Sequence, residues 1–417
     1  MVKEGFRKTE AGVLPNDWSV DYLGKNSLVL RGGSPRPIQD YITDSPNGIN
    51  WIKIGDVKQG EKYINHTEER IIPEGVSRSR TVQLGDFVLS NSMSFGRPYI
   101  LNINGCIHDG WLVIQNYQRT FDRMYLYYAL CSELTLGQYK SMAAGSGVQN
   151  LNKEKVNTVV LPIPKKEEQT AIANTLSDVD ELIISLEKLI TKKKNTRTGT
   201  IQELITGKIR LKGYTDKWKE INLAKNSKLK ARIGWQGLTT DEYMDSGYSY
   251  LITGTDFVDG HIDWKGCHYV TQDRFLQDPN IQVSNGDVLI TKDGTIGKVA
   301  LIDGLTKPAT LNSGVFVVRP TTAEYSPNFL YYVLLSNVFR EFLNKLSAGS
   351  TINHLYQKDL VNFSFFAPDS IEEQEQIAGL IYDMDVEIMK MKKELDKYRQ
   401  IKQGMMNELL TGKIRLV

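Results

Sequence analysis

The chain has 417 residues, of which 41% are hydrophobic and 24% are charged, and 51 basic against 49 acidic side chains leave a net charge of +2. At about 150 residues per domain, this length predicts two or three domains. No apolar run reaches the roughly 18 residues that span a bilayer, and the N-terminus is charged, so we expect a cytoplasmic protein. The small net charge means that any nucleic-acid-binding surface must be local or shared with a partner.

The cysteines and histidines predict no metal site. Cys106, Cys131 and Cys267 are widely spaced and odd in number, so they form neither a disulfide framework nor a CxxC pair. Cys267 and His268 are adjacent and His261 is close, but a zinc site needs four convergent ligands. We therefore expect reduced, buried thiols.

Residues 1–164 have the pattern of a mixed α+β part. Short β-type runs at 51–54 and 87–89 are separated by glycine turns, and a helical stretch is predicted over 125–140. Residues 165–211 then carry apolar side chains at steps of four and three, which predict a long helix with a narrow heptad seam. The seam residues are Ile172, Leu176, Val179, Ile183, Leu186 and Ile190.

The second half repeats this organisation. Residues 212–367 contain β-type runs at 288–290 and 315–318 and a helical stretch over 328–346, and residues 368–417 carry a second heptad seam. Its residues are Ile377, Ile381, Met384, Ile388, Met391 and Leu395. The prolines Pro162, Pro164 and Pro368 stand just upstream of the helices, where helices begin.

An internal repeat joins the halves. Between residues 167–211 and the stretch 205 positions later, 19 of 45 residues are identical, and weaker matches extend upstream. The sequence therefore predicts an α+β fold with two globular parts, separated by two long helices that pair as an antiparallel coiled coil, and an internal pseudo-two-fold repeat. The alternatives are that each seam packs on its own globular part or forms a homodimer.

Three loop families recur in both halves and are predicted to face DNA, because cations contact phosphates and amides contact base edges. The first supplies Arg31, Ser34 and Arg36, and in the second half Lys230, Arg232, Trp235 and Gln236. The second supplies Asn91, Ser92, Ser94 and Arg97, and then Lys292, Thr295 and Lys298. The third supplies Gln149, Asn150 and Lys153, and then Asn353, His354 and Lys358. Each loop alone is equally typical of a solvated turn, and His108 with Asp109 is interpreted as a satisfied polar pair.

Motifs for catalysis are missing from the sequence. There is no G-x-x-x-x-G-K-[ST] phosphate loop, no G-x-G-x-x-G after a strand and no Asn/Asp-Pro-Pro-aromatic run for methyl transfer to a flipped base. The carboxylates and lysines of 287–292 suit a β-turn better than a nuclease centre. We expect no catalytic residues and no cofactor.

The repeated tails resemble those of type I restriction-modification specificity subunits. The shared pattern is Pro-x-Pro-x-x-Glu-Glu-Gln, a heptad helix and Leu-x-Thr-Gly-Lys-Ile-Arg-Leu, which spans 162–211 and recurs from Pro368 to Leu416. The runs 232–235 and 294–297 also resemble recognition-domain sequence. The second tail departs from the pattern because Pro368 has no second proline upstream.

This resemblance implies target-recognition domains at 1–164 and 212–367, a central helical region at 165–211 and a distal helical region at 368–417. It further implies a non-catalytic subunit whose domains each read half of a split, asymmetric site in double-stranded DNA, with the helices setting the gap. The implied partners are two methyltransferase subunits and restriction subunits, with no membrane. The alternative is a coiled-coil scaffold that does not bind DNA; a fused modifying enzyme would need the missing motifs.

Overall fold

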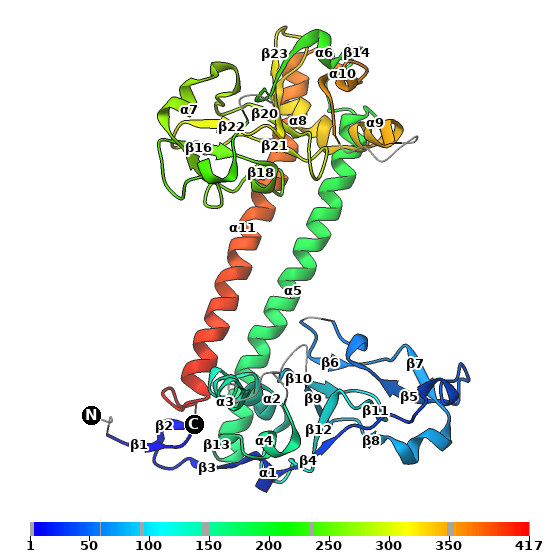
Figure 1. Ribbon diagram of the computed structural model, residues 1–417, viewed down its shortest axis with the longest axis vertical. Coiled ribbons are helices and arrows are strands. Elements are labelled where there is room, and N and C mark those ends of the chain that lie inside the picture. The colour runs from blue at the N-terminus through cyan, green and yellow to red at the C-terminus, as the bar shows by residue number, and fades with distance from the viewer. Residues whose placement is uncertain are drawn as a thin grey trace. The chain divides into compact units, whose positions relative to one another are not determined.

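The computed structural model describes residues 4–58, 60–91, 96–143, 151–233, 237–347 and 354–416. The chain forms two compact units: unit 1 comprises Met1–Glu187 and Lys393–Val417, and unit 2 comprises Lys188–Lys392. The long helices α5 (Lys166–Ile205) and α11 (Ile371–Leu409), labelled in Figure 1, each contribute one segment to each unit. Each unit therefore combines sequence from both halves of the repeat.

Unit 1 is built on two mixed sheets with the strand orders β4-β12-β9-β10-β6 and β7-β5-β11-β8. Strand β3 pairs with β13, the strand that leads into α5. The strands are β1 (Phe6–Thr9), β2 (Gly12–Pro15), β3 (Ser19–Tyr22), β4 (Leu28–Arg31), β5 (Ile49–Ile52), β6 (Tyr63–Ile64), β7 (Glu69–Ile71), β8 (Arg80–Val82), β9 (Phe87–Ser90), β10 (Pro98–Leu101), β11 (Gly105–Ile107), β12 (Trp111–Gln115) and β13 (Val160–Ile163). The shorter helices are α1 (Leu23–Asn26), α2 (Arg123–Cys131), α3 (Glu133–Ala143) and α4 (Lys153–Asn157).

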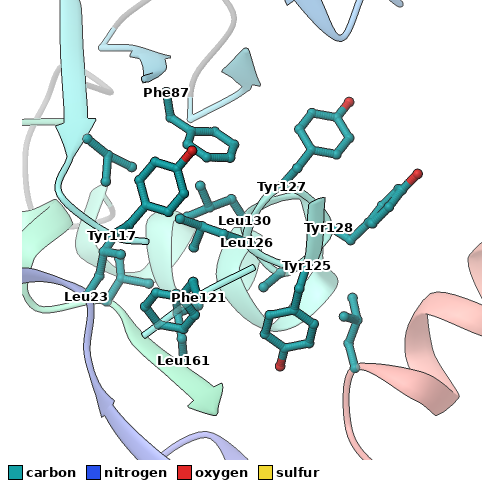
Figure 2. Packing of buried hydrophobic residues seen from close by; sticks show 14 of the residues in the cluster. Leu23, Phe87, Tyr117, Phe121, Tyr125, Leu126, Tyr127, Tyr128, Leu130 and Leu161 are labelled. Atoms are coloured by element: carbon teal, nitrogen blue, oxygen red, sulfur yellow. The ribbon is translucent and has the colours of Figure 1, made fainter. Parts of the chain in front are cut away.

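The largest buried cluster described in unit 1 lies between the sheet β4-β12-β9-β10-β6 and α2. Figure 2 shows Leu126 and Leu130 of α2 close to Phe87 of β9, whose ring meets that of Tyr117 edge-on at 5.0 Å between centroids. Met406, Leu409 and Leu410 from the end of α11 belong to the same buried cluster, together with the first turns of α5. The apolar side chains at the end of the second tail are thus buried in the unit that contains the N-terminus.

Unit 2 repeats this arrangement, with the strand orders β15-β23-β20-β21 and β19-β16-β22. Strand β14 pairs with β24, which leads into α11. The strands are β14 (Trp218–Asn222), β15 (Ser227–Lys230), β16 (Ser249–Ile252), β17 (Phe257–Val258), β18 (His261–Ile262), β19 (His268–Val270), β20 (Val288–Thr291), β21 (Val299–Leu301), β22 (Ala309–Leu311), β23 (Val315–Pro320) and β24 (Ser364–Pro368). The shorter helices are α6 (Leu223–Asn226), α7 (Gln272–Leu276), α8 (Pro327–Leu335), α9 (Asn337–Ser347) and α10 (Gln357–Leu360).

The helical stretches predicted over 125–140 and 328–346 are each broken in the middle. Ser132 separates α2 from α3 and Ser336 separates α8 from α9, and both serines have extended backbone angles. Each serine hydroxyl donates to a carbonyl three residues back, at 2.7 Å for Ser132 and 2.6 Å for Ser336. Serine side chains that bond to nearby backbone compete with helix continuation, which explains the breaks.

The helix seams are buried to different degrees along their length. Ile172 and Leu176 lie in the core of unit 1, and Ile377 and Ile381 lie in the core of unit 2. Further along, Ile190, Ile388 and Leu395 are buried, whereas Val179, Ile183, Leu186, Met384 and Met391 are half-buried. The first turns of each seam therefore pack on their own globular part, and fewer of the later seam residues are fully buried.

Ion pairs show that the helix segments run antiparallel within each unit. In unit 1, Asp180 of α5 contacts Lys402 of α11 at 2.6 Å, and Glu187 contacts Arg399 at 2.7 Å. As α5 advances from 180 to 187, its partners step back along α11. Unit 2 shows the same order: Lys193 contacts Glu387 at 2.7 Å and Arg197 contacts Asp385 at 2.5 Å. The predicted antiparallel helix pairing is confirmed.

The repeated Glu-Glu-Gln motif ties the start of each long helix to its unit. The side chain of Gln169 accepts a hydrogen bond from the Asp122 N–H at 2.7 Å and donates to the carbonyls of Thr120 and Pro164, both at 3.0 Å. Gln374 does the same in unit 2, accepting from the Ser326 N–H at 2.8 Å. The glutamine thus joins the loop before α2 or α8 to the long helix.

Candidate nucleic-acid interface

In unit 1, the first loop family gathers around Asp109. Ser34 Oγ donates to Asp109 Oδ1 at 2.9 Å, Arg36 Nη2 lies 3.3 Å from Asp109 Oδ2, and Arg31 Nε donates to the Asp109 carbonyl at 3.4 Å. Burial opposes ionisation of Asp109, but the Ser34 hydrogen bond and nearby positive charge outweigh it and lower the pKa of Asp109. The carboxylate therefore holds a polar, partly basic loop in place.

Asp109 lies closer to the first loop than to His108, the polar partner that the sequence predicts. His108 Nε2 lies 3.9 Å from the Asp109 carboxylate, farther than Ser34 or Arg36. Asp109 precedes Gly110, and this residue pair, which is typical of a turn, is the sequence signal for its place between strands β11 and β12. Arg36 keeps 81% of its side chain exposed, so its guanidinium remains accessible to a ligand.

The second loop family in unit 1 supplies a buried residue, Asn91. Only 6% of Asn91 is exposed, and its Nδ2 donates to the Asp109 carbonyl at 3.1 Å. Its backbone accepts from the Leu151 N–H at 3.0 Å, which joins the end of the third loop to the second. Asn91 therefore holds the loops together; Ser92 and Ser94 lie outside the described residues.

Arg97 and Lys153 lie at the edges of these loops in unit 1. The Arg97 guanidinium lies 5.5 Å from the centre of the Tyr99 ring, and Lys153 Nζ lies 3.8 Å from Glu154 Oε1. No described contact joins either residue to the Asp109 group. Gln149 and Asn150 lie outside the described residues.

In unit 2, all three predicted loop families contribute residues to one cavity of about 420 Å³. Lys230 and Arg232 come from the first family, Lys292 from the second and His354 from the third. Asp278 and Tyr356 also line the cavity. The folded chain thus brings together predicted residues that are more than one hundred positions apart.

Arg232 is the least exposed of these residues. Only 1% of its surface is exposed, its Nε donates to the Leu311 carbonyl at 2.9 Å and its Nη2 donates to Thr310 Oγ1 at 3.2 Å. Burial, with a smaller repulsion from Arg274, lowers the pKa of Arg232. The sequence predicted a loop cation on the surface; the structure places a buried cation in the wall of a cavity.

The other predicted residues of unit 2 are held by aromatic and acidic neighbours. Lys292 Nζ lies 5.4 Å from the centre of the Phe316 ring. His354 pairs through Nδ1 with the Asp293 carboxylate, and its ring lies 4.4 Å from that of Tyr356. Lys358 Nζ lies 5.1 Å from the centre of the same Tyr356 ring, next to the cavity.

Thr295 and Lys298 lie apart from this cavity. The Thr295 carbonyl accepts from Thr291 Oγ1 at 2.6 Å, and Lys298 lines a separate cavity of about 450 Å³ beside α8 and α9. Trp235, Gln236 and Asn353 lie outside the described residues. The second loop family therefore divides, and Lys292 is the member that joins the Arg232 cavity.

The loops of the two units share one backbone frame. In unit 1 the Asn91 N–H donates to the Gly110 carbonyl at 3.1 Å and the Asn91 carbonyl accepts from the Leu151 N–H at 3.0 Å. In unit 2 Lys292 makes the same bonds, to Gly314 and from Leu355, both at 2.8 Å. Asn91 and Lys292 are therefore equivalent positions with different side chains.

The described ranges contain neither a metal-binding cluster nor a membrane-spanning helix. No group of three or more His, Cys, Asp or Glu side chains described by the structure is arranged to hold a metal ion. None of the helices described has the combination of length and apolar character that crossing a bilayer requires.

Comparison with known proteins identifies relatives along nearly the whole chain. The MjaVIII specificity subunit of a type I restriction enzyme from Methanocaldococcus jannaschii is 25% identical over 435 aligned residues, which cover 99% of this chain and 97% of the relative. Such subunits are the non-catalytic components of restriction-modification complexes, which agrees with the predicted lack of a catalytic role.

Solved structures share the fold. The S subunit of a type I restriction-modification system from M. genitalium aligns with a TM-score of 0.56 at 18% identity, covering 94% of this chain and 96% of that one. A chain from a study of assembly and conformational transition in the type I R-M system aligns with a TM-score of 0.60 at 16% identity, covering 96% and 99%. The family described as "Type I restriction modification DNA specificity domain" matches residues 30–195 and 238–397. Because these matches cover most of both halves, the chain belongs to the family of type I restriction-modification DNA specificity proteins.

Proposed function

We propose that this chain reads a bipartite, asymmetric target in double-stranded DNA, with one half-site for each unit. The observation that carries the proposal is the shared loop frame, in which equivalent positions hold different polar side chains. Asn91 is replaced by Lys292 at the same pair of backbone hydrogen bonds. At this position unit 1 has a buried amide bonded to the Asp109 carbonyl, whereas unit 2 has a lysine that lines a cavity, so the loops of the two units present different surfaces, which favours two different half-sites.

The functional division that follows from this proposal assigns target recognition to residues 1–164 and 212–367. Residues 165–211 and 368–417 supply the helices that set the distance between the half-sites. A stiff connection between two readers fixes half-site spacing, much as a dimer does in other DNA-binding proteins.

The exposed faces of the helices support docking of two methyltransferase subunits and of restriction subunits. On α5 in unit 1, Leu182 and Ile184 are 43% and 45% exposed, and on α11 in unit 2, Leu380 and Tyr382 are 42% and 46% exposed. Residues two positions apart in a helix point to different sides, so these are separate exposed apolar side chains on both helices, which a protein partner would remove from water. A methyltransferase partner would also supply phosphate contacts beyond the few that a chain with a net charge of +2 can make.

The test is to co-express the chain with its partner methyltransferase in a host without DNA methylation and to map modified adenines by single-molecule sequencing. We expect one split motif with a fixed gap, absent when this chain is left out. A purified complex that gives no motif would instead favour a coiled-coil scaffold without DNA binding.

A second measurement addresses the shared phosphate contacts. Affinity for the mapped target is measured for the chain alone and for the complex, at several salt concentrations. We expect tighter binding and a steeper salt dependence for the complex, because more phosphates are neutralised. Equal affinity in both cases would contradict a DNA interface shared with the methyltransferase.

A further inference from the structure

The cavity of unit 2 contains a buried cationic group with unused hydrogen-bonding capacity. Arg232 uses Nε and Nη2 to donate to Leu311 and Thr310, but its Nη1 has no hydrogen-bond partner within the described part of the chain. An unsatisfied donor on a buried charge carries a desolvation cost that a bound acceptor would remove. Arg232 also lines the 420 Å³ cavity, so the unsatisfied guanidinium belongs to a residue of the cavity wall.

Unit 1 has no room for a side chain at the equivalent position. Strands β4 and β15 hold the same place in their sheets, and their registers make Leu30 equivalent to Lys230. Two residues further on, unit 1 has Gly32 where unit 2 has Arg232. A Cβ added to Gly32 would lie 2.1 Å from the backbone oxygen of His108, so the backbone approaches too closely for any side chain there.

The donors around the cavity favour an anion. Lys230 and Lys292 line it together with Arg232, and the carboxylate among its lining residues, Asp278, already accepts from the Asn280 backbone and side-chain nitrogens, both at 2.9 Å. A guanine edge is read by two nitrogens of one arginine fork that lies flat against it, but Arg232 is only 1% exposed and two of its nitrogens donate to the protein. An unsatisfied guanidinium nitrogen in a cavity that two lysines also line suits a phosphate oxygen better.

We propose that this cavity binds one phosphate group of the DNA backbone, through Arg232 Nη1 with Lys230 and Lys292, and that unit 1 has no equivalent site. The inference rests on the proposed reading of DNA and specifies one contact of unit 2. The bound phosphate satisfies the buried guanidinium and fixes the position of the duplex on this unit. The half-site read by unit 2 therefore gains an electrostatic contact that its counterpart lacks.

The experiment uses the full chain in complex with its methyltransferase and the mapped DNA target. Each backbone linkage in both half-sites is replaced in turn by a neutral methylphosphonate, and affinity is measured for the wild type and for Arg232→Met. We expect one linkage, in one half-site, to weaken wild-type binding roughly tenfold and to leave Arg232→Met unaffected. The slope of log affinity against log salt should fall by about one in the variant.

A second variant guards against loss of folding, because Arg232→Met also removes the hydrogen bond to Leu311. Lys292→Met removes a cavity charge whose side chain contacts the Phe316 ring, and it should reduce sensitivity at the same linkage. The methylphosphonate scan on the wild type needs no protein variant at all. Thermal melting of each variant establishes that the folded chain is being compared.

The outcomes separate this proposal from the proposed function. The wild type binding its target, with no linkage whose methylphosphonate replacement has an Arg232-dependent effect on affinity, overturns the phosphate site. This outcome leaves the proposed reading of DNA intact. Absence of wild-type binding overturns both. Inorganic phosphate is titrated calorimetrically as a further arm: binding that requires Arg232, with no Arg232-dependent linkage in DNA, would assign the cavity to a free anion and overturn the backbone contact.

Discussion

Arg210 donates from Nε and Nη2 to both carboxylate oxygens of Glu373, each at 2.8 Å. Arg210 belongs to the end of the first tail and Glu373 to the start of the second, and both lie in unit 2. In unit 1, Arg415 from the end of the second tail contacts Glu168 at the start of the first, with Nε 2.5 Å from Oε1. The arginine of one Thr-Gly-Lys-Ile-Arg-Leu motif therefore binds the glutamate of the other tail's Glu-Glu-Gln motif, and this contact occurs once in each unit.

Removal of the Arg210 side chain should destabilise unit 2. The Glu373 side chain is 0% exposed, so Arg210→Met leaves a buried carboxylate without its cation, at a cost of about 3–5 kcal/mol in unfolding free energy. The double variant Arg210→Met with Glu373→Gln should cost less than the single one, because the uncompensated charge is gone. Denaturant unfolding of the single and double variants measures both; a double variant less stable than Arg210→Met would contradict this account.

The Asp180 carboxylate should make the unfolding free energy depend on pH. Burial raises its pKa, but hydrogen bonds from Lys402 and Lys62 outweigh burial and lower the pKa of Asp180 below its ordinary value of 3.8. A lowered folded-state pKa stabilises the fold at pH values above the ordinary pKa, and this contribution is lost as pH falls through the folded pKa. Asp180→Asn should therefore cost about 2–3 kcal/mol near pH 7 and progressively less below pH about 4.

Asp178→Asn is the matched control, because Asp178 is exposed on the same helix two residues away. Unfolding free energies of both variants are compared with the wild type from pH 7 to pH 3. A difference for Asp180→Asn that stays constant over this range would show that its charge is not what stabilises the helix pair.

Gly32→Ala should destabilise unit 1, since the added Cβ would meet the His108 carbonyl oxygen at 2.1 Å. Overpacking against backbone costs about 1–3 kcal/mol, because a carbonyl cannot rotate away as a flexible side chain can. Gly55→Ala is the control, because no atom would lie within 4 Å of its added Cβ. Thermal unfolding of both variants tests the difference, and equal melting temperatures would argue against the close approach at Gly32.

Lengthening both helices should widen the gap in the recognised DNA. One heptad inserted after Glu187 and another after Lys392 leaves the ion pairs within each unit unchanged and adds about 10.5 Å of helix, or about 3 base pairs. Methylation mapping reads the new gap directly. Insertion into α5 alone should instead disturb the pairing and lower stability, and an unchanged gap after the double insertion would refute a spacing role for the helices.

Charging the exposed apolar residues of α11 should weaken methyltransferase docking. Leu380→Glu with Tyr382→Glu places two carboxylates on the proposed interface, and we expect binding to fall more than tenfold without loss of thermal stability. Leu84→Glu is the control, because Leu84 is 60% exposed and lies in a loop between β8 and β9. Analytical size-exclusion chromatography with the methyltransferase measures complex formation; equal loss for both variants would indicate a nonspecific effect of charge.

The sequence by itself determined the repeat, the long helices and the α+β character of both halves. Heptad spacing and the proline-flanked starts are local properties, so the seam from Ile172 to Ile190 could be read along the chain. The sequence does not predict the serine breaks, because the helical pattern of apolar residues continues across Ser132, and only the hydrogen bond from its hydroxyl to a carbonyl reveals the interruption.

Tertiary structure decided what the loop residues do, since their neighbours come from distant parts of the sequence. Arg232 is buried because Leu311 and Thr310, nearly eighty residues away, accept its hydrogen bonds. Asp109 organises the first loop of unit 1 through Ser34, from which it is separated by 75 positions. The sequence shows which side chains are polar; only the folded chain shows which of them are already satisfied by the protein and which retain a free donor for a ligand.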